Sequence, residues 1–186
     1  MKCLLTSVNT FMDSIILNTQ VRLVSSDLNH PKIQNTLQSK LNDMYLHKFI
    51  KQYGYILEIV SFTYDRNIFL SRINQDIFVN CVVELLTIIP KIGEIYYGIV
   101  KIVYPQGIFV KLLNIFDTLI PSEYLHNLGY VFNNGRFMNS CSDSIVTPID
   151  KDTYINMEII DMKYDNKTFN CIAKLVWAKD IELIQQ

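Results

Sequence analysis

Residues 93–112 read GEIYYGIVKIVYPQGIFVKL and decide the fold of the second half of this chain. β-branched and aromatic side chains flank Pro105-Gln106-Gly107, which predicts a hairpin with a three-residue turn and a return strand that begins at the glycine. Residues 117–121 predict a third short strand, and the alternating segments 153–164 and 167–177 predict a last hairpin across Asp165-Asn166. Between the third and fourth strands lies a polar excursion over 122–152, whose stretches NNGRF (133–137) and NSCSDS (139–144) are expected to be loops. Five strands in this arrangement predict a small closed barrel of the OB type.

The first half of the chain predicts a helix that lies on a small antiparallel sheet. Residues 14–24 predict a strand or a pair of short strands, and a helix is expected to begin after His30-Pro31 and to reach about Phe49. Residues 55–62 and 77–89 predict strands, with a turn at 64–67 between them. The apolar stripe of the helix recurs every three or four residues: Ile33, Leu37, Leu41, Met44, Tyr45 and Leu46.

Pro90 separates the two halves, because a proline cannot continue a ladder in a central strand. The sequence therefore predicts an α+β protein with two domains, residues 1–89 and residues 90–186. Its 186 residues carry 17 Lys+Arg against 18 Asp+Glu, for a net charge of −1. Residues 1–89 contain 8 Lys+Arg and 7 Asp+Glu, and residues 90–186 contain 9 Lys+Arg and 11 Asp+Glu. Neither half is a basic domain, so binding of nucleic acid by bulk electrostatics is not expected.

Sequence motifs for catalysis are missing from the chain. The four cysteines form no CxxC or CxxH pair of the kind that holds zinc, and neither GxxxxGK[ST] nor GxGxxG occurs. The three histidines have no neighbour at a spacing that a catalytic triad or metal site uses. No apolar run approaches the roughly 18 residues of a membrane helix. We therefore expect no catalytic residue, no metal, no cofactor and no membrane partner.

The predicted barrel carries a mixed aromatic and basic face. Barrels that bind single strands combine basic residues with aromatic rings on which bases stack. Phe109 and Lys111 fall on the second strand, and strand or loop order places four more side chains nearby: Lys101, Tyr104, Arg136 and Lys163. Two interpretations stay open. Either Phe109 stacks on a base while the basic residues contact phosphates, or Phe109 fills the barrel and the charges form an ordinary solvated surface.

The order of these segments resembles the stalk subunit of multisubunit DNA-dependent RNA polymerases, the family of the seventh subunit of eukaryotic RNA polymerase II and its archaeal relatives. The resemblance runs from about Met12 to Val176. It rests on His30-Pro31 ahead of the helix, Tyr53-Gly54-Tyr55 at the start of a strand, the Pro90 to Glu94 junction, and Gly107-Ile108-Phe109-Val110. The segment 144–176 also resembles the final barrel hairpin of the family.

This resemblance implies a subunit without catalytic activity of its own that takes part in transcription. An N-terminal tip domain would dock on the large core subunits of the polymerase, and a C-terminal OB barrel would contact nascent single-stranded RNA weakly. A small helical stalk subunit is a further implied partner. The resemblance also matches Asp161 to an acidic position in the fourth strand of related RNA-binding barrels. The candidates for polymerase docking are Tyr53, Gly54, Tyr64, Arg66 and Arg72.

The location implied by the resemblance depends on the source of the chain. A cellular member would work in the nucleus. A viral member, which the 26 Ile and 16 Asn would suit, would work in a virion or a cytoplasmic viral factory. Two other functions stay open: a free-standing OB-fold RNA-binding protein, and a purely architectural protein–protein module.

Overall fold

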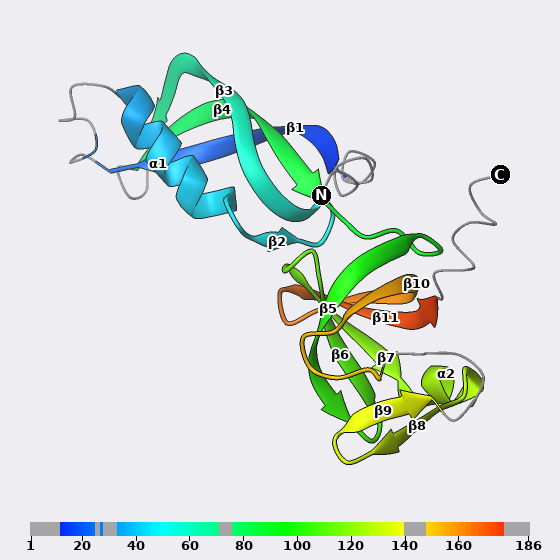
Figure 1. The fold of residues 1–186 in the computed structure, drawn as a ribbon. Helices are drawn as coiled ribbons and strands as arrows, with labels where there is room; N and C mark the ends of the chain where they lie inside the picture. The colour runs from blue at the N-terminus through cyan, green and yellow to red at the C-terminus, as the bar shows by residue number, and fades with distance from the viewer. Residues whose placement is uncertain (1–11, 25–26, 28–32, 71–75, 140–147, 177–186) are drawn as a thin grey trace, which may run out of the picture. The chain divides into compact units, whose positions relative to one another are not determined.

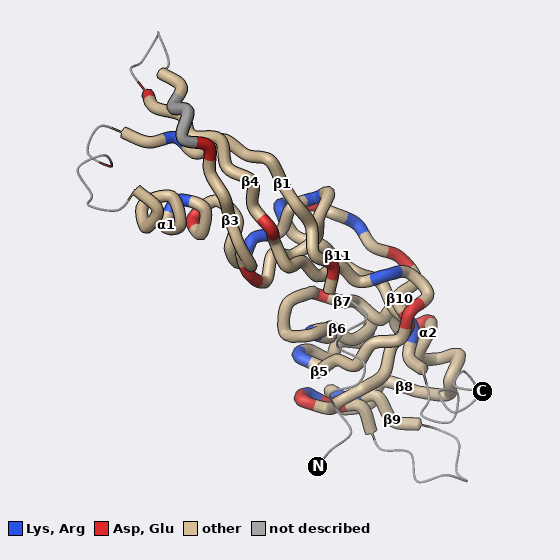
Figure 2. Tube along the Cα trace, turned by 90° about the horizontal axis from the view of Figure 1, so that it is seen from above, with Lys and Arg blue, Asp and Glu red and all other residues tan. Residues whose placement is uncertain are grey.

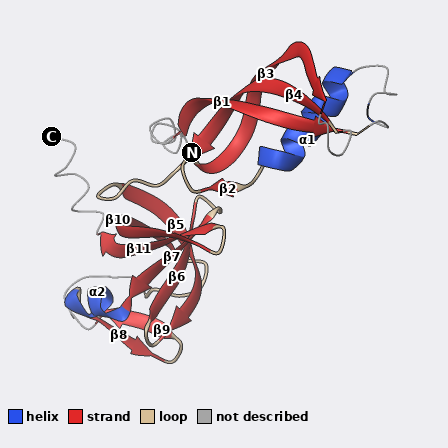
Figure 3. Ribbon diagram, turned by 180° about the vertical axis from the view of Figure 1, so that it is seen from behind, coloured by secondary structure: helices blue, strands red, loops and turns tan. Residues whose placement is uncertain are grey.

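The computed structural model describes residues 12–24, 27, 33–70, 76–139 and 148–176. The chain divides into two compact units, Met1–Ile89 and Pro90–Gln186. The first unit runs from blue to green in Figure 1, and the second from green to red. Strands dominate both units, so the protein is mostly β (Figure 3).

The first unit, over its described residues, contains one helix and an antiparallel sheet in the order β1-β4-β3-β2. Its elements are β1 (Met12–Leu23), α1 (Ile33–Tyr45), β2 (Phe49–Ile50), β3 (Gly54–Leu70) and β4 (Ile77–Ile88). The ladder between β1 and β4 is regular over its whole length, from Met12 opposite Ile88 to Leu23 opposite Ile77. Helix α1 lies along the sheet (Figure 1).

Helix α1 and the sheet share one apolar core. Leu37 and Leu41 are fully buried in the same cluster as Val21 of β1 and Val83 of β4. Residues on one face of β4 alternate into this cluster, as expected for a strand with period two. Met44 does not join the cluster, since its side chain is 39% exposed.

Helix α1 ends earlier than the apolar stripe predicts. Its last residue is Tyr45 rather than Phe49, because His47 takes a φ of 58°. A residue in the left-handed region ends an α-helix. The hydrophobic stripe extends past this point, so hydrophobicity alone placed the end four residues too late.

The turn predicted at 64–67 is wrong, because β3 continues without a break from Gly54 to Leu70. Its pairing with β4 shifts register between Tyr64 and Ile68. A β-bulge of this kind accommodates additional residues in one strand while the ladder continues on both sides. Pairing with β4 therefore overrides the local turn propensity of the Tyr-Asp-Arg-Asn stretch.

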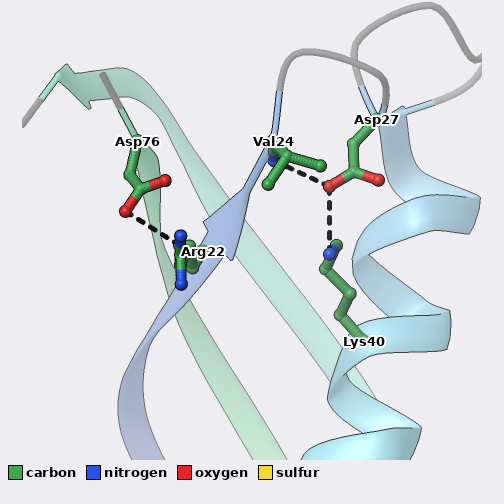
Figure 4. Close-up of polar contacts among 5 residues, drawn as sticks. All are labelled: Arg22, Val24, Asp27, Lys40 and Asp76. Carbon is green, nitrogen blue, oxygen red and sulfur yellow. Dashed lines mark hydrogen bonds and ion pairs between the residues drawn. The ribbon is translucent and has the colours of Figure 1, made fainter. Parts of the chain in front are cut away.

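Polar contacts join side chains of β1, α1 and the residue before β4 with Val24 and Asp27, which follow β1 (Figure 4). The Oδ2 atom of Asp27 accepts a hydrogen bond from the backbone N–H of Val24 at 2.8 Å and lies 2.9 Å from Nζ of Lys40 in α1. Nε of Arg22 in β1 lies 2.9 Å from Oδ2 of Asp76, just before β4. These contacts connect neighbouring elements at the same end of the sheet.

The second unit is built on a closed barrel in the order β10-β11-β7-β6-β5, in which β5 also pairs with β10. Described barrel strands are β5 (Ile95–Tyr104), β6 (Gly107–Leu112), β7 (Phe116–Pro121), β10 (Tyr154–Asp165) and β11 (Thr168–Val176). Neighbouring strands are antiparallel except β7 and β11, which are parallel. The prediction of a closed five-stranded barrel of the OB type is confirmed over the described residues.

The turn between β5 and β6 is one residue shorter than predicted. Tyr104 pairs directly with Gly107, which leaves Pro105 and Gln106 as a two-residue connection. A Cβ atom on Gly107 would lie 2.3 Å from the carbonyl oxygen of Ile120. The close approach of β7 therefore requires a glycine at the start of β6.

The excursion between β7 and β10 is more ordered than predicted. It contains α2 (Ser122–Asn127), β8 (Tyr130–Asn133) and β9 (Arg136–Asn139), and α2 lies beside the β8–β9 hairpin (Figure 1). The loop predicted at 133–137 is wrong. Asn134 and Gly135 have φ values of 48° and 83°, as a type I′ hairpin turn requires. Of the loop predicted at 139–144, residues 140–144 lie outside the described residues.

Candidate nucleic-acid interface

Phe109 lies on the outside of the barrel. Alternation along β6 buries Ile108, Val110 and Leu112 and turns Phe109 and Lys111 outward. The Phe109 side chain is 40% exposed, so it does not fill the barrel, as one of the two open interpretations required. The interior is filled instead by fully buried side chains such as Phe116 and Met157.

Strand register places Phe109 in an apolar row across the outer surface. Going from β5 to β10, the row contains Ile102, Phe109, Leu119, Ile172 and Asp161. Ile102 is 44% exposed and Ile172 is 37% exposed. Partly exposed apolar side chains on four neighbouring strands form a surface on which flat, uncharged groups can rest, and the row ends at a carboxylate.

Tyr104 adds a second ring to this surface. It lies at the end of β5, is 48% exposed, and contacts Phe109 edge to face at a centroid distance of 6.3 Å. The Tyr104–Phe109 pair thus presents two rings in different planes. In single-strand-binding proteins such rings stack on bases without sequence preference, because every base has a π-face.

A second row, parallel to the first, carries charge. It contains Ile99, Lys111, Asp117, Asn170 and Lys163, in order from β5 to β10. Nζ of Lys111 lies 2.8 Å from Oδ1 of Asp117. These side chains are one-third and more exposed, so the ion pair is weak and can rearrange around a phosphate.

Lys101 occupies the bulge of β5, where the register with β6 shifts between Val100 and Ile102. Its Nζ atom lies 3.8 Å from Oδ1 of Asp152, and both side chains are well exposed. Blue and red segments are interspersed along the chain in Figure 2. The face is therefore aromatic with balanced charge rather than strongly basic.

Arg136 lies outside the barrel strands. It begins β9, which pairs with β8 in a separate two-stranded sheet, and β9 contacts β5 of the barrel. That Arg136 lies beside Phe109 stays a prediction. Register brings together Tyr104, Phe109 and Lys111 of β5 and β6, with Lys101 at the bulge of β5. Asp161 and Lys163 lie on β10, three strands away from β6 along the two rows.

The predicted docking residues lie in the first unit. Tyr53 and Tyr64 are partly buried against its apolar core. Gly54 has a φ of 82°, and a Cβ atom there would lie 2.4 Å from the carbonyl oxygen of Ile88. Packing within the first unit therefore explains Tyr53, Gly54 and Tyr64, and no contact with a polymerase subunit is needed to account for them. Arg66 lies in β3, but its side chain is outside the described part of the structure, as is the whole of Arg72.

One aromatic pair on the barrel has no counterpart among the predicted site residues. Tyr97 of β5 and Tyr154 of β10 stack at a centroid distance of 5.2 Å and an interplanar angle of 7°. Their side chains are 47% and 58% exposed. The alternation of each strand indicates that both rings point outward, but only the pairing of β5 with β10 brings them together.

Within the described ranges, no group of three or more His, Cys, Asp or Glu side chains could hold a metal ion. Cys81 and Cys171 are buried free thiols. Burial raises the pKa of Cys171 to about 11 and also raises that of Cys81, so both thiols are protonated and unreactive at neutral pH. No helix in the described residues has the length and apolarity needed to span a bilayer.

Comparison with known proteins gives a limited result. No family model and no curated protein sequence matches the chain. Partial structural similarity is found to RNase R of Mycoplasma genitalium, in its apo form and in complex with ribose-methylated single-stranded RNA. Each has 17% identity and a TM-score of 0.37, and each match covers 46% of this chain and 13% of the RNase R chain. A similarity of this size assigns no activity to the chain.

Proposed function

We propose that this chain is a non-catalytic RNA-binding protein whose barrel binds single-stranded RNA on the outer face of β5, β6 and β7. The observation that carries the proposal is the position of Phe109, which is 40% exposed on the second strand of the barrel. The second and third strands of an OB-type barrel, with the adjoining loops, form the surface that binds oligonucleotides. Tyr104 and the apolar row extend the ring of Phe109 into a stacking surface, and Lys101 and Lys111 supply cations beside it.

Binding is expected to be weak. Lys111 must exchange its contact with Asp117 for a phosphate, and Lys101 has Asp152 nearby. The net charge of the whole chain is −1, so counterion release contributes little and the dependence of affinity on salt should be shallow. Most of the affinity should come from stacking.

Fluorescence anisotropy with a labelled single-stranded 12-mer RNA tests this function. Stacking of one base on an aromatic ring contributes about 1–3 kcal/mol, so Phe109→Ala should weaken binding about 5- to 150-fold. Phe109→Tyr retains the ring and should bind like the wild type. Val131→Ala is the matched control, because Val131 is 52% exposed on β8, which is not a strand of the barrel.

Wild-type affinity for a folded Phe109→Ala protein would refute the proposed site. If the wild-type chain binds no RNA even at low salt, the RNA-binding function itself is wrong, and a purely architectural protein–protein module becomes the better interpretation.

For the cellular setting we propose a stalk subunit of a DNA-dependent RNA polymerase. What supports this setting is the order of the two compact units, a helix with an antiparallel sheet followed by an OB-type barrel, which is the order that the family resemblance implies. In this setting the first unit docks on the large core subunits, and the barrel meets nascent RNA. The small helical subunit would be a further partner.

Purification of the tagged full chain from its native cells, followed by mass spectrometry, tests the setting. The large polymerase subunits should co-purify at low salt and be retained by the Phe109→Ala protein, because Phe109 lies on the second unit. Their absence would refute the polymerase setting without affecting RNA binding measured on the isolated protein.

A further inference from the structure

The Tyr97–Tyr154 pair lies on the barrel exterior in an arrangement suited to stacking. The two rings are nearly parallel, with an interplanar angle of 7°, and each has about half of its side chain in solvent. Cross-strand aromatic pairs stabilise a sheet, but that role accounts only for the surface the rings hide from each other. The exposed part of each side chain is available for contact with a third flat group.

Strand register connects this pair to the Phe109 surface. Tyr154 lies opposite Ile99 of β5, and Ile99 lies opposite Lys111 of β6. Since neighbouring strands are about 4.8 Å apart, Lys111 is separated from Tyr154 by only two strand spacings. Phe109 is the next outward-facing residue of β6 after Lys111.

Strand β5 thus carries an aromatic pair near each end. Tyr97 and Tyr104 are seven residues apart on β5, which corresponds to about 20 Å along a strand. Lys101 lies between them at the bulge, and a bulge redirects the side chain that it carries. Lys111 lies beside the same middle part of β5, so two cations separate two pairs of rings.

We propose that the Tyr97–Tyr154 pair is a second base-stacking site and that single-stranded RNA follows β5 from the Tyr104–Phe109 pair to the Tyr97–Tyr154 pair. Lys101 and Lys111 contact the phosphates between the two stacked ends. This inference rests on the proposed RNA-binding function and defines the ligand as a single strand long enough to reach both pairs. Aromatic rings spaced along a path, with cations that contact the backbone between them, are the arrangement by which proteins hold single strands without reading their sequence.

Binding of 5′-fluorescein-labelled oligouridylates of 4 and 12 nucleotides to the full chain tests the path. A 12-mer can occupy both sites, so the double variant Tyr97→Ala/Tyr154→Ala should weaken its binding about 5- to 150-fold. A 4-mer can still occupy the Phe109 site, so its affinity should change less than about twofold, as expected from the loss of one of two alternative sites. Tyr97→Phe/Tyr154→Phe keeps both rings and should keep 12-mer affinity. Val131→Ala is again the control for an exposed position outside the path.

Photocrosslinking provides a readout that does not depend on a variant folding. A 12-mer containing 4-thiouridine, irradiated with the wild-type chain, should crosslink to peptides that contain Tyr97 or Tyr154 as well as Phe109. Crosslinks at Phe109 alone would overturn the second site.

Different results would refute the path along β5 and the RNA-binding function. If folded Tyr97→Ala/Tyr154→Ala protein binds the 12-mer like the wild type while Phe109→Ala protein does not, the β5 path is wrong and the RNA-binding function stands. If the wild-type chain binds neither oligouridylate, both are wrong.

Discussion

Gly98 of β5 is closely packed between neighbouring barrel strands, and Gly98→Ala is expected to destabilise the protein. Gly98 is buried and lies opposite Ile155 of β10 and Leu112 of β6. A Cβ atom there would lie 2.4 Å from Cε of Met157 and 2.6 Å from Cγ1 of Val110. Because β5 pairs with both β6 and β10, it cannot move away from one without approaching the other.

Two opposing effects determine the magnitude. Replacing glycine with alanine lowers the conformational entropy of the unfolded chain and would stabilise the protein by about 0.4–1 kcal/mol if the site had room. Carbon atoms at optimal separation are about 3.5–4.0 Å apart, so both contacts are much too short. Overpacking of this kind costs about 1–3 kcal/mol. The clash therefore wins, with a net loss of about 1–2 kcal/mol.

A double-mutant cycle with Met157→Ala isolates the cause. Met157→Ala alone should cost about 2–5 kcal/mol through the cavity that it leaves. It also removes the atom that lies 2.4 Å from the new Cβ, so Gly98→Ala should cost less in that background, where only the 2.6 Å contact with Cγ1 of Val110 still clashes severely. Gly135→Ala is the control. It has no neighbouring heavy atom within 4 Å but a φ of 83°, so its cost should not depend on Met157.

Urea unfolding followed by circular dichroism measures the four free energies of the cycle. A coupling of at least about 1 kcal/mol between Gly98 and Met157 is expected, since substitutions at contacting residues are not additive. If the two effects add within about 0.5 kcal/mol, contact with Met157 does not require the glycine, and the reasoning about barrel closure fails.

Three further predictions concern the packing of each unit. Gly54→Ala should destabilise the first unit by about 1–3 kcal/mol in urea unfolding, since it combines a φ of 82° with a contact 2.4 Å from the carbonyl oxygen of Ile88; unchanged stability would contradict this. Leu41→Ala should cost about 2–5 kcal/mol, because Leu41 is fully buried between α1 and the sheet; a loss under about 1 kcal/mol, typical of surface positions, would show that α1 is not packed there. Burial raises the pKa of Cys171 from 9.0 to about 11, so the folded state retains the thiol proton more strongly than the unfolded chain. The stability contributed by the protonated Cys171 thiol is fully present below pH 9, and the free energy of unfolding should fall by about 2 kcal/mol as the pH rises to 11. Cys171→Ala should reduce this loss when unfolding is measured across that range. An identical pH dependence in the variant would refute the prediction.

Local sequence signals predicted the barrel strands well, because each signal operates within one strand or turn. In β6 the alternation of Ile108, Phe109 and Val110 specifies which side chains point inward once one face is buried. The Asn134-Gly135 dipeptide was an equally local signal for the β8–β9 hairpin. The β8–β9 hairpin was therefore predictable from the sequence. The end of α1, in contrast, depends on the backbone conformation of His47, which hydrophobic spacing does not encode.

Features that join distant segments were beyond local prediction. β3 crosses the turn-forming stretch 64–67 because β4 offers a continuous line of hydrogen-bond partners on both sides of the bulge. The place of Arg136 in a separate two-stranded sheet depends on the pairing of β9 with β8. The salt bridge between Lys111 and Asp117 likewise depends on the register of β6 with β7.

The sequence by itself determined the strand periodicity, the apolar face of α1 and the break before Pro90, because alternation, helical spacing and the missing N–H of proline act over a few residues. Which face of β6 is buried, and therefore the outward position of Phe109, was decided by the barrel. Only the tertiary structure decided which outward side chains become neighbours. Tyr97 and Tyr154 are 57 positions apart in the chain, and the closure of the barrel between β5 and β10 brings their rings into contact. The aromatic pair near each end of β5, with two lysines between the pairs, results from the register of β5 with β6 and β10. The sequence of one strand does not specify that register.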